Sequence, residues 1–86
     1  MGYRIEFTAG ARRDFEALTK VMRRRIDITL RLLQGNPRPP KAERLQGKLR
    51  EYHRVRVGEF RIIYLIEDDK LVVCVIRIGH RKDVYR

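Results

Sequence analysis

The sequence contains no serine and only one cysteine, Cys74, in 86 residues. Without serine, a Ser-His-Asp triad is excluded, and a single cysteine cannot form an internal disulfide. Cys74 lies in the apolar run from Leu71 to Ile76, where we expect a buried, unreactive thiol in a reducing compartment. These absences exclude hydrolases with a serine nucleophile and small secreted domains that depend on disulfides.

Histidine is equally scarce. The two histidines, His53 and His80, lie far apart in the sequence, with no cysteine or carboxylate group at metal-ligand spacing. The chain lacks the glycine-rich motif that binds nucleotide phosphates, and no apolar run is long enough to cross a bilayer. Its N-terminus also lacks the apolar core of a signal peptide. We therefore expect no metal, no cofactor and no membrane association, in a cytoplasmic protein.

Positive charge is what the sequence has in excess. There are 21 Lys and Arg against 11 Asp and Glu, a net charge of +10, and sixteen of the 21 are arginine. The planar guanidinium group binds phosphate oxygens through paired hydrogen bonds and stacks on bases. Such a surplus on a chain that can close only one hydrophobic core favours a polyanionic partner. We expect a single domain over residues 1–86 that binds nucleic acid, in preference to a membrane surface.

The first half of the chain changes from strand to helix periodicity. Residues 3–7 alternate between apolar and polar side chains, which predicts a strand. Apolar residues then recur at helical spacing over residues 11–33, with one interruption. We expect two helices, capped at their N-termini by Thr8 and Thr19, with Gly35 ending the second as a C′ glycine.

The second half has strand periodicity. Strands are predicted at Val55–Val57, at Phe60–Ile66 and at Leu71–Ile78, and a short hairpin turn over residues 67–70 joins the last two. The fold class is therefore α+β: an N-terminal strand, a two-helix hairpin, then antiparallel strands forming one twisted sheet with the helices packed on one face. The first strand must join this sheet, beside a neighbour that the sequence does not identify.

Two arginines in the second half of the chain are positioned to bind phosphates. Arg54 and Arg56 are two residues apart in a strand, so both project from the same face of the sheet. A separation of about 7 Å between them is close to the spacing of neighbouring phosphates in a single strand. Arg61 lies across a tight turn near Gly58 and could complete a cluster. The alternative is three exposed arginines on a solvated sheet face.

The end of the chain, from Ile78 to Arg86, adds histidine, arginine and tyrosine just after the last predicted strand, where Gly79 lets the chain turn. Cleavage of RNA without a metal requires a group that takes the proton of the 2′-OH. It also requires charge that stabilises the phosphorane, and an acid for the 5′-oxygen. Arginine can supply the charge. The candidates for proton transfer are His80, His53, Glu59 and Tyr85.

Positive charge is concentrated in two segments. Residues 38–61 hold eight basic residues against three acidic ones, and residues 77–86 hold four against one. These cations flank the arginine cluster, so we expect several of them to bind the RNA backbone. The residues expected to do so are Arg44, Lys48, Arg50 and Lys82.

Three motifs together resemble the RelE/ParE toxin superfamily. They are Leu45-Gln46-Gly47, the run from Tyr52 to Tyr64 that contains Arg-Val-Arg-Val-Gly-Glu-Phe-Arg, and the ending from Gly79 to Tyr85. The likeness covers nearly the whole chain, including the order of the predicted elements. Similarity to RelE implies a metal-independent endoribonuclease that enters the ribosomal A site and cuts mRNA through attack of the 2′-OH. It also implies a cognate RelB-like antitoxin, in a toxin–antitoxin heterotetramer.

The resemblance assigns roles residue by residue. It matches Arg54 and Arg56 to two basic strand positions, and Arg61 to an arginine that stabilises the phosphate. In the tail, it matches Arg81 to a further arginine and Tyr85 to a tyrosine that stacks on a base. The best-known members carry lysines at the paired strand positions, and lysine can act as a base whereas arginine effectively cannot. We therefore expect His80, beside Arg81, to transfer a proton, with Tyr85 as the alternative and His53 as a structural residue.

Two other functions fit the same sequence. A ParE-like toxin shares the fold but inhibits DNA gyrase, and the combination of Arg61, Arg81 and Tyr85 favours the nuclease over it. A non-catalytic RNA-binding module would bind RNA without cutting it.

Ile28 and Leu32 are surplus to the apolar stripe of the second helix, and exposed apolar side chains at these positions would suit an antitoxin groove.

Overall fold

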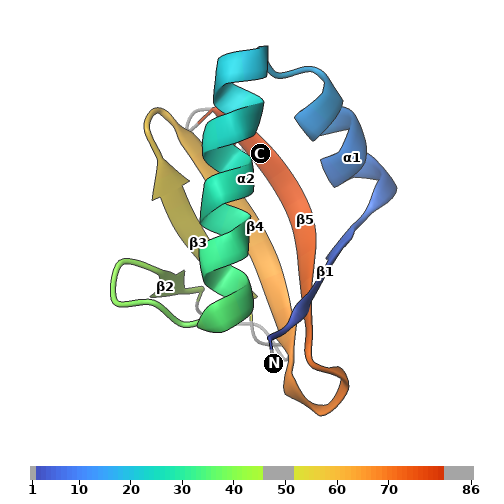
Figure 1. Cartoon of the computed structure of the whole chain (residues 1–86), viewed down its shortest axis with the longest axis vertical. Coiled ribbons are helices and arrows are strands. Elements are labelled where there is room, and N and C mark those ends of the chain that lie inside the picture. The colour runs from blue at the N-terminus through green and yellow to red at the C-terminus, as the bar shows by residue number, and fades with distance from the viewer. Residues whose placement is uncertain (1, 46–51, 81–86) are drawn as a thin grey trace.

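The computed structural model describes residues 2–45 and 52–80. The elements in chain order are β1 (Arg4–Phe7), α1 (Ala9–Glu16), α2 (Lys20–Gly35), β2 (Glu43–Arg44), β3 (Tyr52–Val57), β4 (Phe60–Glu67), the 3₁₀ turn η1 (Asp68–Lys70) and β5 (Val72–His80). The strands form one sheet in the order β1-β5-β4-β3-β2 (Figure 1). β1 runs parallel to β5, and the other neighbours are antiparallel. The predicted α+β fold is confirmed, and β5 is the neighbour of the first strand.

Both helices cover the same face of the sheet (Figure 1). The core lies between the two layers, where Ile26 and Leu33 of α2 pack with Val55, Ile62 and Val75 of the central strands. Side chains alternate across a strand, so the residues between these core positions point to the opposite face. That opposite face, which neither helix covers, receives every second side chain of β3 and β4.

The helix N-termini are capped as predicted, but the end of α2 is not. The Thr8 and Thr19 hydroxyl oxygens accept the amide N–H groups of the third residue after each, at 3.0 and 3.2 Å. Gly35 was expected to lie beyond α2 as a C′ glycine, and this was wrong, because it is the last helical residue. Asn36 ends the helix in an extended conformation (φ −153°), since the following Pro37 disfavours helical geometry in the residue before it.

Three strand predictions also need correction. β3 begins at Tyr52, three residues before the predicted start, and the short β2 was not predicted. Gly79 does not turn the chain, because β5 continues through it to His80 in register with β4. Cys74 is half-buried on β5, not fully buried as expected. The pairing of Gly79 with Arg61 and of His80 with Phe60 on β4 extends β5 beyond the range that its apolar pattern marks.

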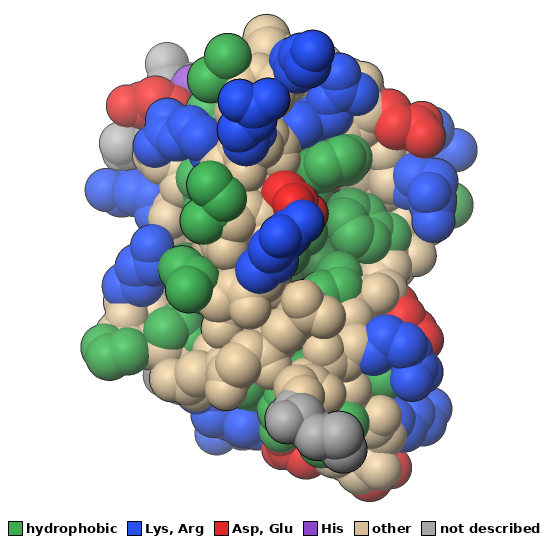
Figure 2. Space-filling model, in the orientation of Figure 1, with side chains coloured by type: hydrophobic (Ala, Val, Ile, Leu, Met, Phe, Trp, Pro, Cys, Tyr) green, Lys and Arg blue, Asp and Glu red, His purple; other side chains and the backbone are tan. Residues whose placement is uncertain are grey.

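The outer surface of α2 leaves large apolar side chains exposed. Ile28 is 56% and Leu32 63% exposed, as predicted, and Val21 is 72% exposed. Figure 2 shows hydrophobic side chains set among Lys and Arg on the face that α2 forms. In the described part of the chain, no helix has the length and apolar character needed to cross a membrane.

Polar contacts hold the loops at the end of the sheet opposite the β3–β4 turn. The Arg38 guanidinium donates to Asp68 Oδ2 at 2.7 Å, and the Tyr3 hydroxyl donates to Asp68 Oδ1 at 2.5 Å. These two hydrogen bonds, led by that of Arg38, lower the pKa of Asp68. The bond to Asp68 is the main cause that raises the pKa of Tyr3. The buried Tyr64 hydroxyl donates to the Pro37 carbonyl at 2.7 Å and fixes the loop after α2.

Candidate active site

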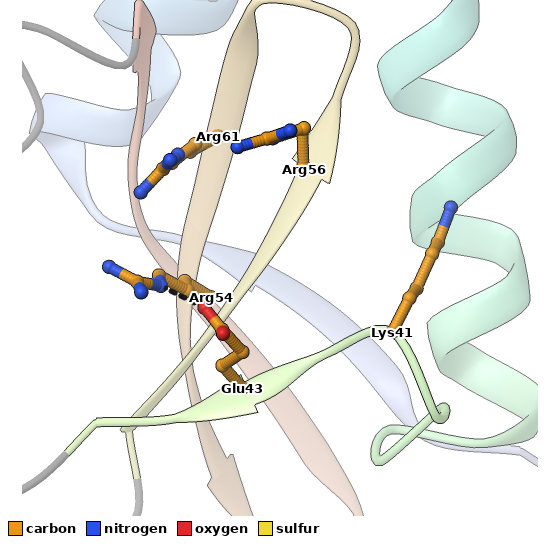
Figure 3. A pocket seen from close by; sticks show the side chains of 5 residues that line it. All are labelled: Lys41, Glu43, Arg54, Arg56 and Arg61. Atoms are coloured by element: carbon orange, nitrogen blue, oxygen red, sulfur yellow. Dashed lines mark hydrogen bonds and ion pairs between the residues drawn. The ribbon is translucent and has the colours of Figure 1, made fainter.

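Three of the predicted arginines share one face of the sheet. Arg54 and Arg56 project from β3 on the side opposite Val55 and Val57, which are buried under the helices. Arg61 lies on β4 directly opposite Arg56 in the antiparallel register. Figure 3 shows the three side chains extending from the two strands on this common face. The structure therefore brings these three side chains to one face of the sheet.

The three arginines line one hollow of about 360 Å³ together with Lys41 and Glu43 (Figure 3). Four of these five side chains are cations and one is a carboxylate, so the hollow carries a formal charge of +3. A concave surface lined by charge of one sign concentrates counter-ions and anionic ligands. The geometry suits the binding of phosphate groups.

The turn between β3 and β4 fixes the register that places Arg56 opposite Arg61. Gly58 in this turn has φ +61°, a left-handed conformation that glycine adopts without the steric cost of a Cβ. The Arg25 guanidinium of α2 packs beneath it, and a Cβ at Gly58 would lie 3.1 Å from Arg25 Nη1. Glycine is thus required here both by the backbone conformation and by the close approach of α2.

Among the described residues that line the hollow, Glu43 is the carboxylate. Arg54 Nε donates to Glu43 Oε1 at 2.6 Å, and the Glu43 side chain remains 64% exposed. The contact follows from the pairing of Glu43 with Arg54 across β2 and β3. Arg56, in contrast, has no ion-pair partner among the residues that the structure describes. One arginine of the hollow is therefore neutralised by the protein itself, and its neighbour on the same strand is not.

Two other candidates lie on the helix side of the sheet. Arg44 pairs with His53, whose side chain is buried, so Arg44 shares the face opposite to the hollow. His80 pairs with Phe60, and their rings meet edge to face with centroids 5.8 Å apart. His80 lines a separate hollow with Leu18 and other residues of the α1–α2 junction. The structure does not bring Arg44 or His80 together with the three arginines.

The remaining candidates divide between structural positions and undescribed segments. His53 is 5% exposed and stacks on Tyr64 with ring centroids 5.6 Å apart, which is the environment of a core residue. Glu59 is exposed in the β3–β4 turn. The candidates that lie outside the described residues are Lys48, Arg50, Arg81, Lys82 and Tyr85.

Sequence reasoning missed Glu43 and Lys41 as site residues, because the segment before Tyr52 has no strand periodicity of its own. The available signal was the position of Glu43 within a basic segment upstream of Arg54. Within residues 2–45 and 52–80, no group of three or more His, Cys, Asp or Glu side chains is placed to hold a metal ion. The described site therefore consists of guanidinium groups, one ammonium group and one carboxylate.

Comparison with known proteins agrees with this architecture. Residues 5–85 match the family model of the ParE toxin of type II toxin–antitoxin systems. Toxin RelG of Mycobacterium tuberculosis is 30% identical over 87 residues, which cover 100% of this chain and 99% of that protein. The chain therefore belongs to the ParE toxin family of type II toxin–antitoxin systems, within the RelE/ParE superfamily.

Solved structures give the same fold. The toxin–antitoxin complex RelBE2 of Mycobacterium tuberculosis contains a chain with a TM-score of 0.78 and 27% identity, and the match covers 94% of this chain and 100% of that one. The RelE–RelB complex of Pyrococcus horikoshii gives a TM-score of 0.83 at 23% identity, covering 98% of this chain and 100% of that one. At that lower identity the likeness concerns the fold alone.

Proposed function

We propose that this toxin is an endoribonuclease of the RelE kind, which cuts mRNA in the ribosomal A site without a metal ion. The observation that carries the proposal is the convergence of Arg54, Arg56 and Arg61 on one hollow beside the carboxylate of Glu43. The names of its relatives support it, because the 30% identical protein is called Toxin RelG. Structural neighbours at 25% identity or above include the RelE toxin of Escherichia coli.

In this mechanism the arginines hold the scissile phosphate. Arg56 and Arg61 face each other across two hydrogen-bonded strands, so a phosphate between them can accept hydrogen bonds from both guanidinium groups. As the 2′-oxygen attacks phosphorus, negative charge builds up on the non-bridging oxygens. Donors fixed on a sheet stabilise that charge without reorganising, and the loss of one such donor typically slows a reaction by about 100- to 1000-fold.

Glu43 is the group that we assign to the first proton transfer. Arginine keeps its proton at any physiological pH, and Lys41 is a cation, so Glu43 is the proton acceptor among the described residues that line the hollow. Its exposed side chain and its contact with Arg54 support a position at the edge of the proposed phosphate site. Transfer of the 2′-OH proton to a positioned carboxylate is general base catalysis.

The proton for the 5′-oxygen has to come from another group. Tyr85 is the tail residue proposed to donate this proton and also to stack on a base, and Arg81 is proposed to stabilise negative charge on the leaving-group side. A role for His80 in proton transfer stays a prediction, and it would require the imidazole to reach round the end of β5 from the helix side of the sheet. Arg44, Lys48, Arg50 and Lys82 are proposed contacts to the RNA backbone.

The proposed partner in the absence of the ribosome is a RelB-like antitoxin. Several structural neighbours are complexes of RelE with RelB, and we propose that this chain assembles in the same way, in a heterotetramer. The exposed Ile28 and Leu32 on α2 provide an apolar surface for it. Such a toxin acts in the cytoplasm, where its ribosomal target is found.

A second candidate function has an observation in its favour. The matching family model is that of ParE, and ParE-like toxins inhibit DNA gyrase and do not cut RNA. The same fold would then use its basic surface to bind a protein or DNA, and the arginine hollow would have no catalytic role. A non-catalytic RNA-binding module is the third candidate, and it predicts binding without cleavage.

One experiment separates the three functions. The toxin is induced in cells and the 5′ ends of translated transcripts are mapped, for the wild type, for Arg61→Ala and for Arg12→Ala. The proposal expects cuts at defined codon positions with the wild type and with Arg12→Ala, which alters an exposed residue of α1 away from the hollow, and strong loss of cuts with Arg61→Ala. Growth arrest without mRNA cuts, together with gyrase inhibition, would contradict it and support the ParE-like function.

A further inference from the structure

β1 ends at Phe7. Beyond this point, the side of β5 that faces away from β4 is hydrogen-bonded to α1 instead of to a strand. β1 pairs with β5 only as far as Val75. The Thr8 hydroxyl then donates to the Ile76 carbonyl at 2.9 Å, and Asp14 Oδ2 accepts the Ile78 N–H at 2.9 Å. Two side chains from the start and the end of α1 therefore satisfy backbone groups that would otherwise be left open on a sheet edge.

The register of β5 changes at the same place. Ile63 pairs with Arg77 while Tyr64 pairs with Val75, so Ile76 is an extra residue, a β-bulge. A bulge disrupts the ladder locally and re-aims the side chains that follow it. After this one, Ile78 points into the core and Arg77 points outward to Asp14. Thr8 and Asp14 hold the bulged strand on either side of its irregular residue.

Asp14 is the stronger of the two anchors. Its Oδ2 accepts Arg77 Nε at 2.8 Å as well as the Ile78 N–H, and its side chain is only 19% exposed. The hydrogen bond to Asp14 is the largest cause of the raised pKa of the Arg77 guanidinium, which favours its charged form. One carboxylate thus fixes both the backbone and a side chain at the point where β5 approaches the arginine hollow.

The next residue of β5 connects this anchor to the hollow. Gly79 pairs directly with Arg61 of β4, and Arg61 lines the hollow with Arg54 and Arg56. We infer that Asp14 is a positioning residue: through the Ile78 N–H it fixes the end of β5, which in turn supports Arg61. The inference rests on the proposed nuclease function for its effect on rate.

The test uses the purified toxin on ribosomes programmed with a defined mRNA, under single-turnover conditions. Asp14→Ala is expected to slow cleavage, by up to about 100-fold for a displacement near 1 Å, at an unchanged half-saturating ribosome concentration. Asp14→Asn keeps an oxygen that can accept the Ile78 N–H, so it should cut at nearly the wild-type rate. Asp14→Glu keeps the charge but moves the carboxylate by one methylene group, so it should be slower than Asp14→Asn.

Arg77→Met is the matched control, because it removes the ion pair and leaves the bond from Asp14 to the Ile78 N–H. It should cut like the wild type. Wild-type rates for both Asp14→Ala and Asp14→Glu, or a slow Asp14→Asn beside a fast Asp14→Glu, would overturn the inference.

A second measurement keeps this inference separate from the proposed function. Amide hydrogen exchange at Ile78 should accelerate in Asp14→Ala and stay slow in Asp14→Asn, whether or not the toxin cuts RNA. A wild type that leaves mRNA intact would defeat the nuclease proposal, while exchange at Ile78 would still decide whether Asp14 fixes β5. Unchanged exchange in Asp14→Ala would show that Asp14 does not hold this strand.

Discussion

Arg56 and Arg61 stand directly opposite each other across the β3–β4 pair, on the face of the sheet that the helices leave open. Like charges at directly opposed positions of an antiparallel pair destabilise a sheet. The chain nevertheless adds Arg54 two residues away and ends the two strands in a tight turn at Gly58, which holds the pair together. A polyanionic ligand relieves this repulsion. We therefore interpret the pair as a feature that lowers the folding stability of the free toxin and favours ligand binding.

Replacing Arg56 with Gln should therefore stabilise the free toxin while impairing its function. Removal of one charge of the opposed pair is expected to raise the free energy of unfolding by about 0.2–1 kcal/mol, measured by urea denaturation. Cleavage of mRNA on the ribosome should fall in the same variant, because a phosphate-binding donor is lost. Arg12→Gln, on exposed α1, is the control and should change neither quantity. A less stable Arg56→Gln would contradict this account of the pair.

The sequence alone predicted that Arg54, Arg56 and Arg61 share one face of the sheet, but it did not predict the whole site. Alternation along β3 placed Arg54 and Arg56 on one side, and the Gly58 turn placed Arg61 beside them, because strand geometry depends only on local spacing. Glu43 reaches the hollow through β2, a strand of two residues that forms by pairing with β3. No local pattern encodes such a pairing.

His80 shows the same limit from the other direction. Its position in the sequence, one residue before Arg81, suggested that it shares the site. Residues two apart in a strand point to the same face, however, and His80 lies two residues after the buried Ile78. The continuation of β5 through Gly79 decided its side of the sheet, and this continuation depends on pairing with β4 and on the bonds from α1. The helices were easier to predict, since Thr8 and Thr19 act within a single turn.

The contact between Arg38 and Asp68 should make stability depend on pH in the acid range. The pKa of Asp68 is lower in the folded protein than its ordinary value, first because of the bond from Arg38 and then because of the bond from Tyr3. A lowered carboxyl pKa contributes stability above its unfolded value, near 3.8, and this contribution is lost as the pH falls through the folded value. Asp68→Asn should thus lower Tm between pH 5 and 7, with the difference from wild type closing below about pH 4.

The measurement is Tm for both proteins from pH 7 down to pH 2. Asp69→Asn, at the adjacent exposed position of η1, is the matched control, and its Tm should follow that of the wild type throughout. A difference between wild type and Asp68→Asn that persisted unchanged at pH 2 would mean that the charge of Asp68 is not what stabilises this end of the sheet.

Two glycines should respond to alanine with opposite signs. Gly58 has φ +61° and packs against Arg25, so Gly58→Ala should cost about 1–2 kcal/mol from the left-handed conformation alone. Gly35 is the last residue of α2 with no atom within 4 Å of an added Cβ, so Gly35→Ala should be neutral or stabilising, by up to about 0.5 kcal/mol. Urea denaturation of the two variants compares them directly. Equal effects at both sites would disprove the requirement for glycine at Gly58.

Glu43→Gln should separate binding from catalysis. In the free toxin the carboxylate neutralises Arg54 at 2.6 Å, so its removal leaves a more positive hollow and should tighten binding of a non-cleavable mRNA analogue with a 2′-deoxy group at the cut site. The same substitution removes the proposed proton acceptor, so the single-turnover rate should fall by about 100- to 10,000-fold. The two effects are measured on the same programmed ribosomes.

Glu59→Gln, in the exposed β3–β4 turn, is the control for loss of a nearby negative charge, because it changes the charge without touching the hollow. Tighter binding with an undiminished rate would restrict Glu43 to competing with phosphate for Arg54, and the base would then have to be sought in the C-terminal tail.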